Sequence, residues 1–302
     1  MSKVTQIMDY YAQKITGKLG LGFKNFKTQE EYYINGDERF PAASTFKIPV
    51  LIELFNQVHS GKISLTDMIV MQEDDISPGS GVLSALMPGL SMSVRDYAVL
   101  MMIVSDNTGT DIIYNLVGRE NIAAMIKNMG LKNTRCDMNC KELLFSFKGV
   151  PAGSSREQYK KMEEEKSFVT NYALLSDMTD IPNDVSSPAD MVKMLSLIYN
   201  HELFSPEYCM EMLEIMGLCQ TNSRIPFYLP KEGPHAAKVS HKTGTLEVVA
   251  NDCGIIFTPT QTYALTMYYN GYTASEREKE MPQYKDFLLA DISKEIFNAL
   301  HS

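Results

Sequence analysis

The segment "FPAASTFKIPVLIELF", residues 40–55, contains a serine and a lysine three positions apart at the start of an apolar run. Apolar residues recur at helical spacing from residue 46 to residue 58, which predicts a helix with one buried face. Because residues three apart on a helix lie on the same side, we expect the side chains of Ser44 and Lys47 to meet. A helix cap followed by an exposed lysine has the same pattern, so this segment alone leaves both interpretations open.

The composition excludes several classes of protein. A chain of 302 residues is long enough for one large domain or two modest ones, with a substantial core. Hydrophobic residues at 44% and charged residues at 22% are typical of a soluble globular protein. The net charge of -9 argues against a nucleic-acid partner, and the longest apolar run, residues 97–104, is too short to span a bilayer. We therefore expect neither nucleic acid nor membrane as a partner.

The N-terminus and the cysteines bear on the cellular compartment. The first twenty residues carry polar side chains every few positions and lack the uninterrupted apolar region of a signal peptide. The cysteines are odd in number and have no C-x-x-C spacing, so we expect reduced, mostly buried thiols rather than disulfides or a zinc site. These features favour the cytoplasm, or the periplasm or secretion if a leader was removed. The histidines have no ligand spacing, and no metal or organic cofactor is expected. The cysteines are Cys136, Cys140, Cys209, Cys219 and Cys253.

The two ends of the chain carry the clearest secondary-structure patterns. Apolar residues at helical spacing predict amphipathic helices over residues 4–15 and 288–300. Alternating or aromatic segments predict strands within residues 18–26, 31–40, 251–257 and 262–271. The Asn35-Gly36 pair indicates a hairpin. The sheet is therefore expected to be antiparallel and built from both chain ends.

The middle of the chain is expected to be helical. Serine caps, prolines in first turns and glycines after apolar runs mark the ends of several helices, at Ser93 with Asp96, Gly118, Gly130, Ser187-Pro188 and Ser205-Pro206. The polar segment at about 145–180 reads as a surface insertion with a short helix over 155–166. The predicted fold is a single α+β domain, an α/β sandwich with an all-helical lobe. The sheet lobe covers about 1–43 and 233–302, and the helical lobe covers about 44–232.

Two further motifs follow the S-x-x-K pair in the chain. S-D-N occupies residues 105–107, where an apolar helix is expected to end, and K-T-G occupies residues 242–244, where a strand is expected to begin. Three such motifs in this order resemble those of the class A serine β-lactamases and the penicillin-binding D,D-peptidases related to them. The resemblance implies the β-lactamase/transpeptidase-like fold and covers nearly the whole chain. It extends to "PGSGVL" at 78–83, "NTRCD" at 133–137, "IPNDVSSPADM" at 181–191 and "QTNSRIPFYLP" at 220–230.

The resemblance implies a catalytic set of four residues. Ser44 would be the nucleophile, and Lys47 would remove its proton if burial and a second cation hold the amine neutral part of the time. Ser105 would pass a proton toward the leaving nitrogen, and Lys242 would set the local potential. Asp106 has a structural role in the family.

A substrate-binding set is also implied, consisting of Asn107, Thr243, Gly244 and Thr245. Lys242 and Thr243, with Ser105, would bind a substrate carboxylate, and Asn107 would hold a side-chain amide. The backbone N–H groups of the nucleophile and of Thr245 would form the oxyanion hole. Arg224 is either a further positive charge for that carboxylate or a surface or domain-bridging arginine.

The chain departs from the class A pattern where the deacylating water is held. Aligned on "TRCD", Cys140 stands at the position of the water-activating glutamate, and Leu144 replaces the asparagine. General-base help is worth roughly 10²- to 10⁴-fold, so we expect ready acylation and slow release. Glu142, or a carboxylate among residues 163–165, is an alternative base, although a charge run is usually a solvated face.

These residues predict a serine hydrolase of β-lactamase type that acts on a β-lactam or related amide through an acyl-enzyme. Its partner would be a small-molecule substrate. One alternative is a peptidase or esterase for a D-Ala-D-Ala-like substrate. Another is a penicillin-binding sensor or scavenger that is acylated without turnover.

Overall fold

The computed structural model describes residues 1–151, 153–176, 178, 181–275 and 284–302. The chain is α+β, as predicted, and forms two compact units. The first unit consists of residues 1–46, 131–134 and 185–302, and the second of residues 47–130 and 135–184. Among the described residues, no helix has both the length and the apolar character needed to cross a membrane.

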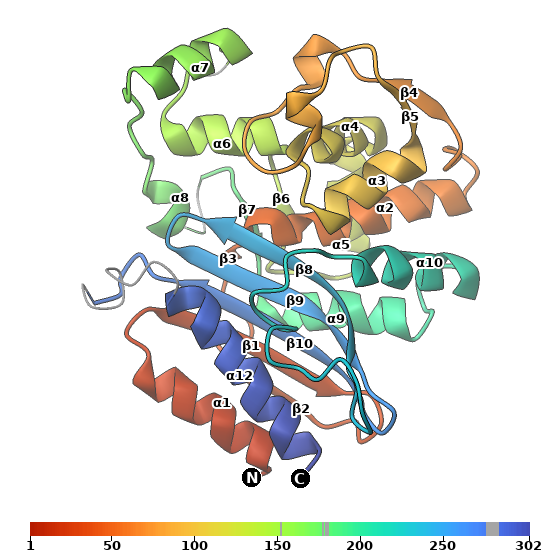
Figure 1. Cartoon of the computed structure of the whole chain (residues 1–302), viewed down its shortest axis with the longest axis vertical. Helices are drawn as coiled ribbons and strands as arrows, with labels where there is room; N and C mark the ends of the chain where they lie inside the picture. The colour runs from red at the N-terminus through yellow and green to blue at the C-terminus, as the bar shows by residue number, and fades with distance from the viewer. Residues whose placement is uncertain (152, 177, 179–180, 276–283) are drawn as a thin grey trace. The chain divides into compact units, whose positions relative to one another are not determined.

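The first unit is built on a five-stranded antiparallel sheet with the order β2-β1-β10-β9-β8. Figure 1 shows the red strands of the N-terminal end beside the blue strands of the C-terminal end, which confirms a sheet made from both ends. The strands are β1 (Lys18–Asn25), β2 (Glu31–Ile34), β8 (Lys238–Leu246), β9 (Val249–Phe257) and β10 (Thr262–Asn270).

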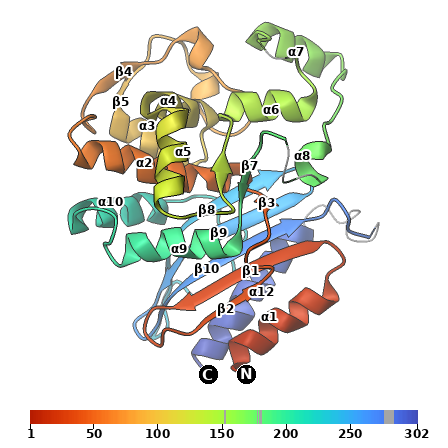
Figure 2. The ribbon, with the colours of Figure 1, turned by 180° about the vertical axis from the view of Figure 1, so that it is seen from behind.

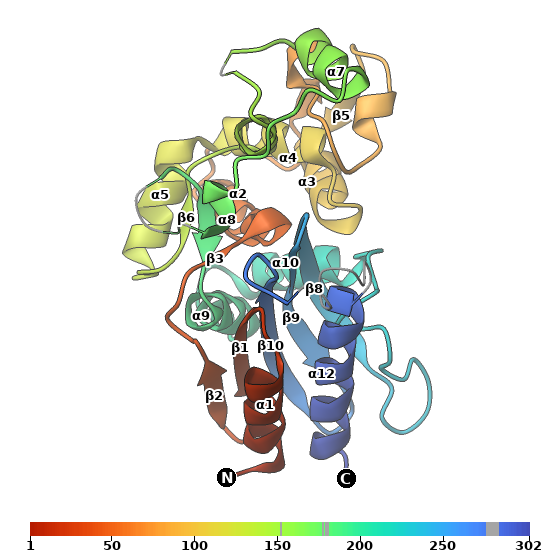
Figure 3. The same ribbon diagram turned by 90° about the vertical axis from the view of Figure 1, so that its left-hand side faces the viewer.

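Helices cover both faces of this sheet (Figure 3). The predicted terminal helices are confirmed as α1 (Lys3–Lys14) and α12 (Tyr284–Leu300), which pack on each other and on the face that carries Leu21. On the opposite face, a Cβ atom at Gly22 would lie 2.8 Å from the side chain of Val192. The missing side chain thus lets α9 (Pro188–Tyr199) approach the sheet closely.

The hairpin predicted at Asn35-Gly36 is wrong. The short strand that follows, β3 (Phe40–Pro41), pairs with β7 (Asp184–Ser186) rather than with β2. Asn35 has a positive φ of 50° and donates its side-chain amide to the carbonyl of Leu19, at 2.7 Å. The pair therefore ends β2 and redirects the chain.

Residues 185–232 lie in a different part of the molecule from the one predicted. They were expected with the helices, but they belong to the first unit, because α9 contacts β1 and β10 and α10 (Pro206–Gly217) contacts β8. The serine-proline starts are confirmed, with Ser187 accepting from the backbone N–H of Asp190 and proline in the first turn of both helices.

The second unit is mainly helical, and Figure 2 shows α5 beside α2 and α4. Ser93 caps α3 by accepting from the N–H of Asp96, as predicted, and Gly118 ends α4. The helices are α2 (Lys47–His59), α3 (Val94–Ile103), α4 (Asn107–Val117), α5 (Arg119–Asn128), α6 (Cys140–Lys148), α7 (Arg156–Glu164) and α8 (Ala173–Ser176). The smaller elements are β4 (Met68–Val70), β5 (Ser91–Ser93), β6 (Arg135–Cys136), η2 (Glu73–Asp75) and η3 (Leu83–Ala85).

The predicted insertion contains more structure than its polarity indicated. The helix expected over 155–166 is confirmed as α7, with Ser155 as its cap. Phe145, Tyr159 and Phe168 form a small aromatic cluster that fixes α7 to α6, with ring centroids 5.0 to 5.2 Å apart. Residues 152, 177, 179 and 180 of this segment lie outside the described residues.

Candidate active site

Lys47 is the first residue of α2 and is fully buried. Its Nζ donates to three oxygens, the carbonyl and hydroxyl of Ser105 at 2.8 and 3.0 Å and Oδ1 of Asn107 at 2.9 Å. Burial lowers the pKa of Lys47, while the nearby Cys140 and the acidic side chains act against this. A neutral amine in this position keeps two donors and can accept the proton of the Ser105 hydroxyl, which is what a proton relay requires.

The S-D-N segment is held in its bend by Asp106. Ser105 has a positive φ of 56°, a conformation that needs support from its surroundings. Asp106 caps α4 by accepting from the N–H of Gly109 at 2.9 Å, and its other oxygen accepts from the N–H groups of Val82 and Leu83 at 2.6 and 2.8 Å. Asp106 therefore ties the helix start to the preceding loop.

That loop approaches the S-D-N segment so closely that it needs glycine. A Cβ atom at Gly81 would lie 2.3 Å from the Asp106 carboxylate, and its φ of 110° also favours glycine. The hydroxyl of Ser80 shares its single hydrogen between the carbonyl of Ser105 at 2.8 Å and Oδ1 of Asn107 at 3.2 Å. Sequence analysis did not single out Ser80, although its "PGSGVL" segment was part of the resemblance.

Ser44 lies in the 3-10 turn η1 (Ala43–Phe46) of the first unit. Ala43 has a positive φ of 43°, and the Asn251 side chain donates to the carbonyls of Pro41 and Ala42 at 2.8 and 2.9 Å. Ser44 is half-buried between fully buried neighbours, so the turn presents its side chain from a fixed backbone.

The K-T-G strand packs directly on this turn. A Cβ atom at Gly244 would lie 2.6 Å from the carbonyl oxygen of Ala42 and 3.2 Å from the backbone nitrogen of Ser44. Glycine is therefore required where β8 meets the serine turn. Lys242 is fully buried and donates to the carbonyl of Thr243 at 2.8 Å, whereas Thr245 is exposed.

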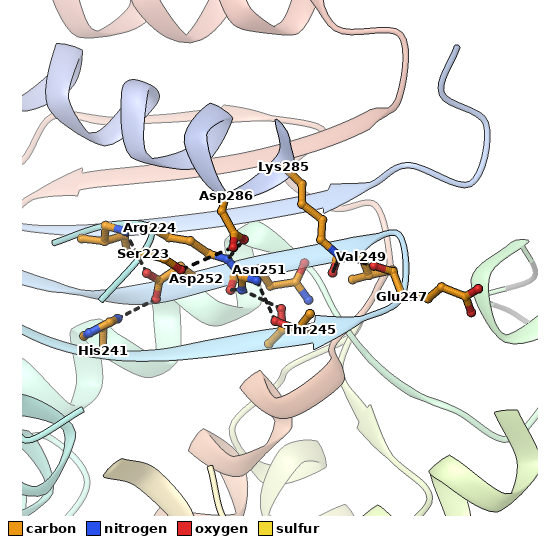
Figure 4. A network of polar contacts seen from close by, with 12 residues as sticks. Ser223, Arg224, His241, Thr245, Glu247, Val249, Asn251, Asp252, Lys285 and Asp286 are labelled. Carbon is orange, nitrogen blue, oxygen red and sulfur yellow. Dashed lines mark hydrogen bonds and ion pairs between the residues drawn. The ribbon is translucent and has the colours of Figure 1, made fainter. Parts of the chain in front are cut away.

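Arg224 binds the C-terminal end of β8, the strand that carries K-T-G (Figure 4). Its Nε donates to Asp286 at 2.7 Å, Nη1 donates to the carbonyls of Gly244 and Asn251 at 2.8 and 2.6 Å, and Nη2 donates to the Thr245 hydroxyl at 2.6 Å. The surface interpretation of Arg224 is wrong, because the residue is only 2% exposed. Its charge is shared between the ion pair with Asp286 and hydrogen bonds to carbonyls of β8 and β9.

Positions 140 and 144 of α6 do not carry a base. Cys140 is buried, and its backbone N–H donates to Asp111 at 2.6 Å. Burial raises the pKa of the Cys140 thiol well above its ordinary value, with the charge of Lys47 acting in the opposite direction. Leu144 lies beside Gly79, where a Cβ atom would be 3.0 Å from its side chain. Neither group can activate water near neutral pH.

The alternative bases occupy other positions. Glu142 accepts from the N–H of Asn139 at 2.9 Å as part of a capping box and pairs with Arg119 at 2.5 Å. Glu163 of α7 lines a cavity of about 230 Å³ in the second unit, together with Gly79, Phe145 and Arg156. Glu142 is thus committed to a helix cap, whereas Glu163 faces an open space.

The motif residues are divided between the two units. Lys47, Ser105 and Asn107 come together in the second unit, while Ser44 and residues 242–245 come together in the first. The chain crosses from one unit to the other between Phe46 and Lys47. The expected contact between the side chains of Ser44 and Lys47 therefore stays a prediction.

Known proteins resemble this chain over nearly its whole length. A model of the β-lactamase enzyme family matches residues 1–300. β-Lactamase VEB-1 of Pseudomonas aeruginosa is 23% identical over 292 residues, which cover 93% of this chain and 85% of that protein. A β-lactamase structure from Sphaerobacter thermophilus has a TM-score of 0.78 at 27% identity, covering 99% and 97% of the two chains. A mutant of PBP-A, solved as an acyl-enzyme complex with penicillin-G, has a TM-score of 0.77 at 24% identity, covering 99% and 96%.

Proposed function

Because the chain belongs to the β-lactamase enzyme family, we propose that it is a serine hydrolase that opens a β-lactam or related amide through an acyl-enzyme on Ser44. The observation that carries this proposal is the environment of Lys47. A fully buried amine with a lowered pKa, hydrogen-bonded to the S-D-N serine, is the environment that a general base requires.

Acylation would proceed by proton transfer within the motif residues. The Ser44 oxygen attacks the amide carbonyl and forms the new C–O bond, while Lys47 takes the hydroxyl proton. The C–N bond then breaks, and the proton passes through the Ser105 hydroxyl to the leaving nitrogen. The 3.0 Å hydrogen bond between Lys47 Nζ and Ser105 Oγ supports this relay.

The first unit would stabilise the charge that develops on the substrate. Backbone N–H groups of Ser44 and Thr245 would form the oxyanion hole, and the close packing at Gly244 supports a fixed spacing between their backbones. Lys242 and Thr243 would bind the substrate carboxylate, with Arg224 adding positive potential through its bond to Thr245. Asn107 would hold a side-chain amide of the substrate.

We infer that release of the acyl group is slow. Cys140 has a high pKa and Leu144 is apolar, so the segment that positions water in class A enzymes offers neither a base nor a second polar ligand. A water without general-base help reacts roughly 10²- to 10⁴-fold more slowly. This favours a protein that holds its acyl group for long periods, as a penicillin-binding sensor or scavenger would.

The test combines a chromogenic cephalosporin with intact-mass analysis over time. We expect a stoichiometric burst, a mass increase located on Ser44, and slow steady-state turnover. Absence of both the adduct and the turnover, in protein whose folding is confirmed by circular dichroism, would reject the proposal. Rapid turnover without an accumulating adduct would reject only the inference of slow deacylation, and the proposed serine hydrolase would stand.

A D-Ala-D-Ala peptide separates the peptidase alternative from the others. Both substrates would acylate the same serine, so their turnover rates can be compared directly. Release of D-alanine faster than β-lactam hydrolysis would identify a D,D-peptidase. Inertness toward the peptide, with an adduct from the cephalosporin, would favour a β-lactam-specific acceptor. Ser44→Ala is the control for both substrates, since it keeps the fold and removes the nucleophile.

A further inference from the structure

The cavity that Glu163 lines lies within the second unit, where α6, α7, η3 and the loop before Ser80 contribute its lining. The apolar wall of this cavity consists of Ile76, Pro78 and the ring of Phe145, and α7 supplies charged and polar side chains. The volume of about 230 Å³ lies below the roughly 300 to 1,000 Å³ of sites for drug-sized molecules. The cavity therefore suits a ligand of about the size of an amino acid.

Two separate sets of contacts fix α7 beside the cavity. Tyr159 stacks on Phe145 of α6 with ring centroids 5.2 Å apart, and Figure 2 shows α7 next to α6. Arg156 pairs with Glu73 of η2 at 3.1 Å, and its Nη2 donates to the carbonyl of Ser84 in η3 at 3.0 Å. The cavity is therefore pre-formed, and a ligand that enters it loses little free energy to the ordering of side chains.

One face of α7 carries opposite charges into the cavity lining. The four lining residues of this helix follow one another at helical spacing, so they lie on one side of it. They are Arg156, Tyr159, Lys160 and Glu163. Arg156 is occupied by its two contacts, but among the described residues neither Lys160 nor Glu163 has a hydrogen bond or an ion pair. The cavity is therefore lined by one ammonium and one carboxylate group that the described residues leave without a partner.

These two charges exclude most kinds of ligand. A simple anion would be repelled by Glu163, and a simple cation would be repelled by Lys160 and Arg156. A neutral molecule would displace water from both charged groups without replacing the hydrogen bonds of that water. A molecule that carries both an ammonium and a carboxylate group avoids each of these costs, because its carboxylate can bind Lys160 and its ammonium can bind Glu163.

We propose that this cavity is a binding site for an α-amino-acid group on a short aliphatic chain. Lys160 binds the carboxylate, Glu163 binds the ammonium, and the chain packs on the apolar wall. The group belongs to a free amino acid or ends the acyl side chain of an amide substrate, and the second source rests on the proposed function. Asn107, which would hold the substrate amide, donates from Nδ2 to the carbonyl of Pro78 at 2.8 Å and so contacts the cavity lining directly.

The first test measures the binding of free ligands to the full chain by ligand-observed NMR, with no β-lactam present. Norleucine carries the whole α-amino-acid group, hexanoate lacks its ammonium, and pentylamine lacks its carboxylate. An ion pair at an exposed position contributes up to about fivefold to an affinity, so norleucine should bind about fivefold more tightly than either analogue. Equal binding of the three compounds, or no saturable binding of norleucine, would exclude a free amino acid as the ligand.

Substitutions in α7 locate the binding. Lys160→Gln and Glu163→Gln should each lower the affinity for norleucine about fivefold. Lys161→Gln and Glu164→Gln remove the same charges at neighbouring positions outside the cavity lining, and they should leave the affinity unchanged. All four positions are exposed, so each variant should fold. Equal losses in the four variants would show a response to net charge alone and would refute the site.

A second arm tests a substrate side chain as the source of the group. Cephalosporin C, glutaryl-7-aminocephalosporanic acid and cephalothin share one nucleus, and their side chains end in an α-amino acid, a carboxylate and a thiophene ring respectively. If the cavity binds the side chain, cephalosporin C at low concentration should acylate Ser44 about fivefold faster than the other two compounds. Lys160→Gln should remove this difference, and Lys161→Gln should keep it.

The outcomes distinguish the two sources of the group and the two proposals. Norleucine binding without a preference for cephalosporin C assigns the cavity to a free amino acid, and the reverse result assigns it to a substrate side chain. Neither effect, in protein that reacts with cephalothin, overturns the binding site and leaves the proposed function standing. No reaction with any cephalosporin rejects the proposed function, and absence of norleucine binding in the same protein then overturns the binding site as well.

Discussion

Two helix starts in the second unit show how differently the same kind of backbone site is used. The start of α4 carries Ser105 and Asn107, both bonded to the buried Lys47. The start of α6 carries Cys140, a thiol whose pKa is raised by burial. Asp111 connects them, because it lies on α4 and accepts from the N–H groups of Cys140 and Lys141 at 2.6 and 2.9 Å.

This contrast indicates that the groups for acylation and for water activation are separable parts of one fold. The N–H groups at the start of α6 are bonded by Asn139 and Asp111, and Glu142 completes the capping box, so the helix needs no further glutamate at position 140. Exchange of a water-activating residue for a buried thiol therefore leaves the packing intact. The following predictions test the contrast, from the largest expected effect to the smallest.

The largest effect is expected on adduct formation when Lys47, the partner of the α4 start, is replaced. Lys47→Met keeps the apolar stem but removes the amine, so adduct formation should fall by about 10³-fold, within the range for loss of a general base. Stopped-flow measurement of the nitrocefin burst gives the rate. Lys62→Ala, at an exposed position after α2, is the matched control and should leave the rate unchanged. A burst of ordinary rate in Lys47→Met would show that another group takes the proton.

A pair of residues that activates water can be introduced into α6 at positions 140 and 144. Cys140→Glu with Leu144→Asn should shorten the lifetime of the Ser44 adduct by about 10²-fold, the lower end of the general-base range. Burial at this position would raise the pKa of the new carboxyl, against the charge of Lys47, so the gain should increase with pH. Decay of the adduct mass after removal of free β-lactam measures the lifetime.

Cys140→Gln with Leu144→Asn is the matched control for that gain. It has the same size and polarity without a base, and it should leave the lifetime close to that of the unmodified protein. An equal acceleration by the glutamine variant would attribute the effect to water access rather than to proton transfer.

Loss of the buried Asp111 side chain should lower the free energy of unfolding more than loss of an exposed aspartate such as Asp96. Asp111→Ala leaves two backbone N–H groups of α6 without their acceptor and removes the shorter of the two hydrogen bonds of the Ser77 hydroxyl, so the free energy of unfolding should fall by about 3 kcal/mol. Urea denaturation measures the change. Asp96→Ala, which removes an exposed contact with Ser93, should cost less than about 1 kcal/mol. Equal costs would mean that Asp111 does not anchor α6.

Burial of Lys47 should appear in the pH profile of adduct formation. The base is the neutral amine, so the rate should rise about tenfold per pH unit below the pKa and level off above it. Because burial lowers this pKa, the plateau should be reached below the ordinary lysine value of 10.5. Between the two values the unfolded chain binds more protons, so the contribution of Lys47 to folding stability rises with pH. A rate still rising at pH 10.5 would contradict the lowered pKa.

The smallest effect is expected in α7. Glu163→Gln and Glu164→Gln should each change the lifetime of the adduct by less than about twofold, because a charge run in an insertion is usually a solvated face. Glu163 lines the cavity beside Gly79 and Glu164 does not, which makes them a matched pair. A tenfold longer lifetime in Glu163→Gln alone would identify it as the missing base.

The sequence by itself determined the elements that depend on near neighbours. The terminal helices follow from apolar spacing, and the starts of α3, α7 and α9 follow from serine caps. Such signals act over about four residues, which is the reach of a helical turn.

Only the tertiary structure decided which distant groups became partners. Lys47 meets the Ser105 hydroxyl 58 residues away, Arg224 meets Asp286 at a separation of 62, and β3 pairs with β7 instead of with the adjacent β2. These pairings depend on how whole helices and strands pack, and packing also sets the burial that shifts each pKa, so local sequence patterns do not reveal them.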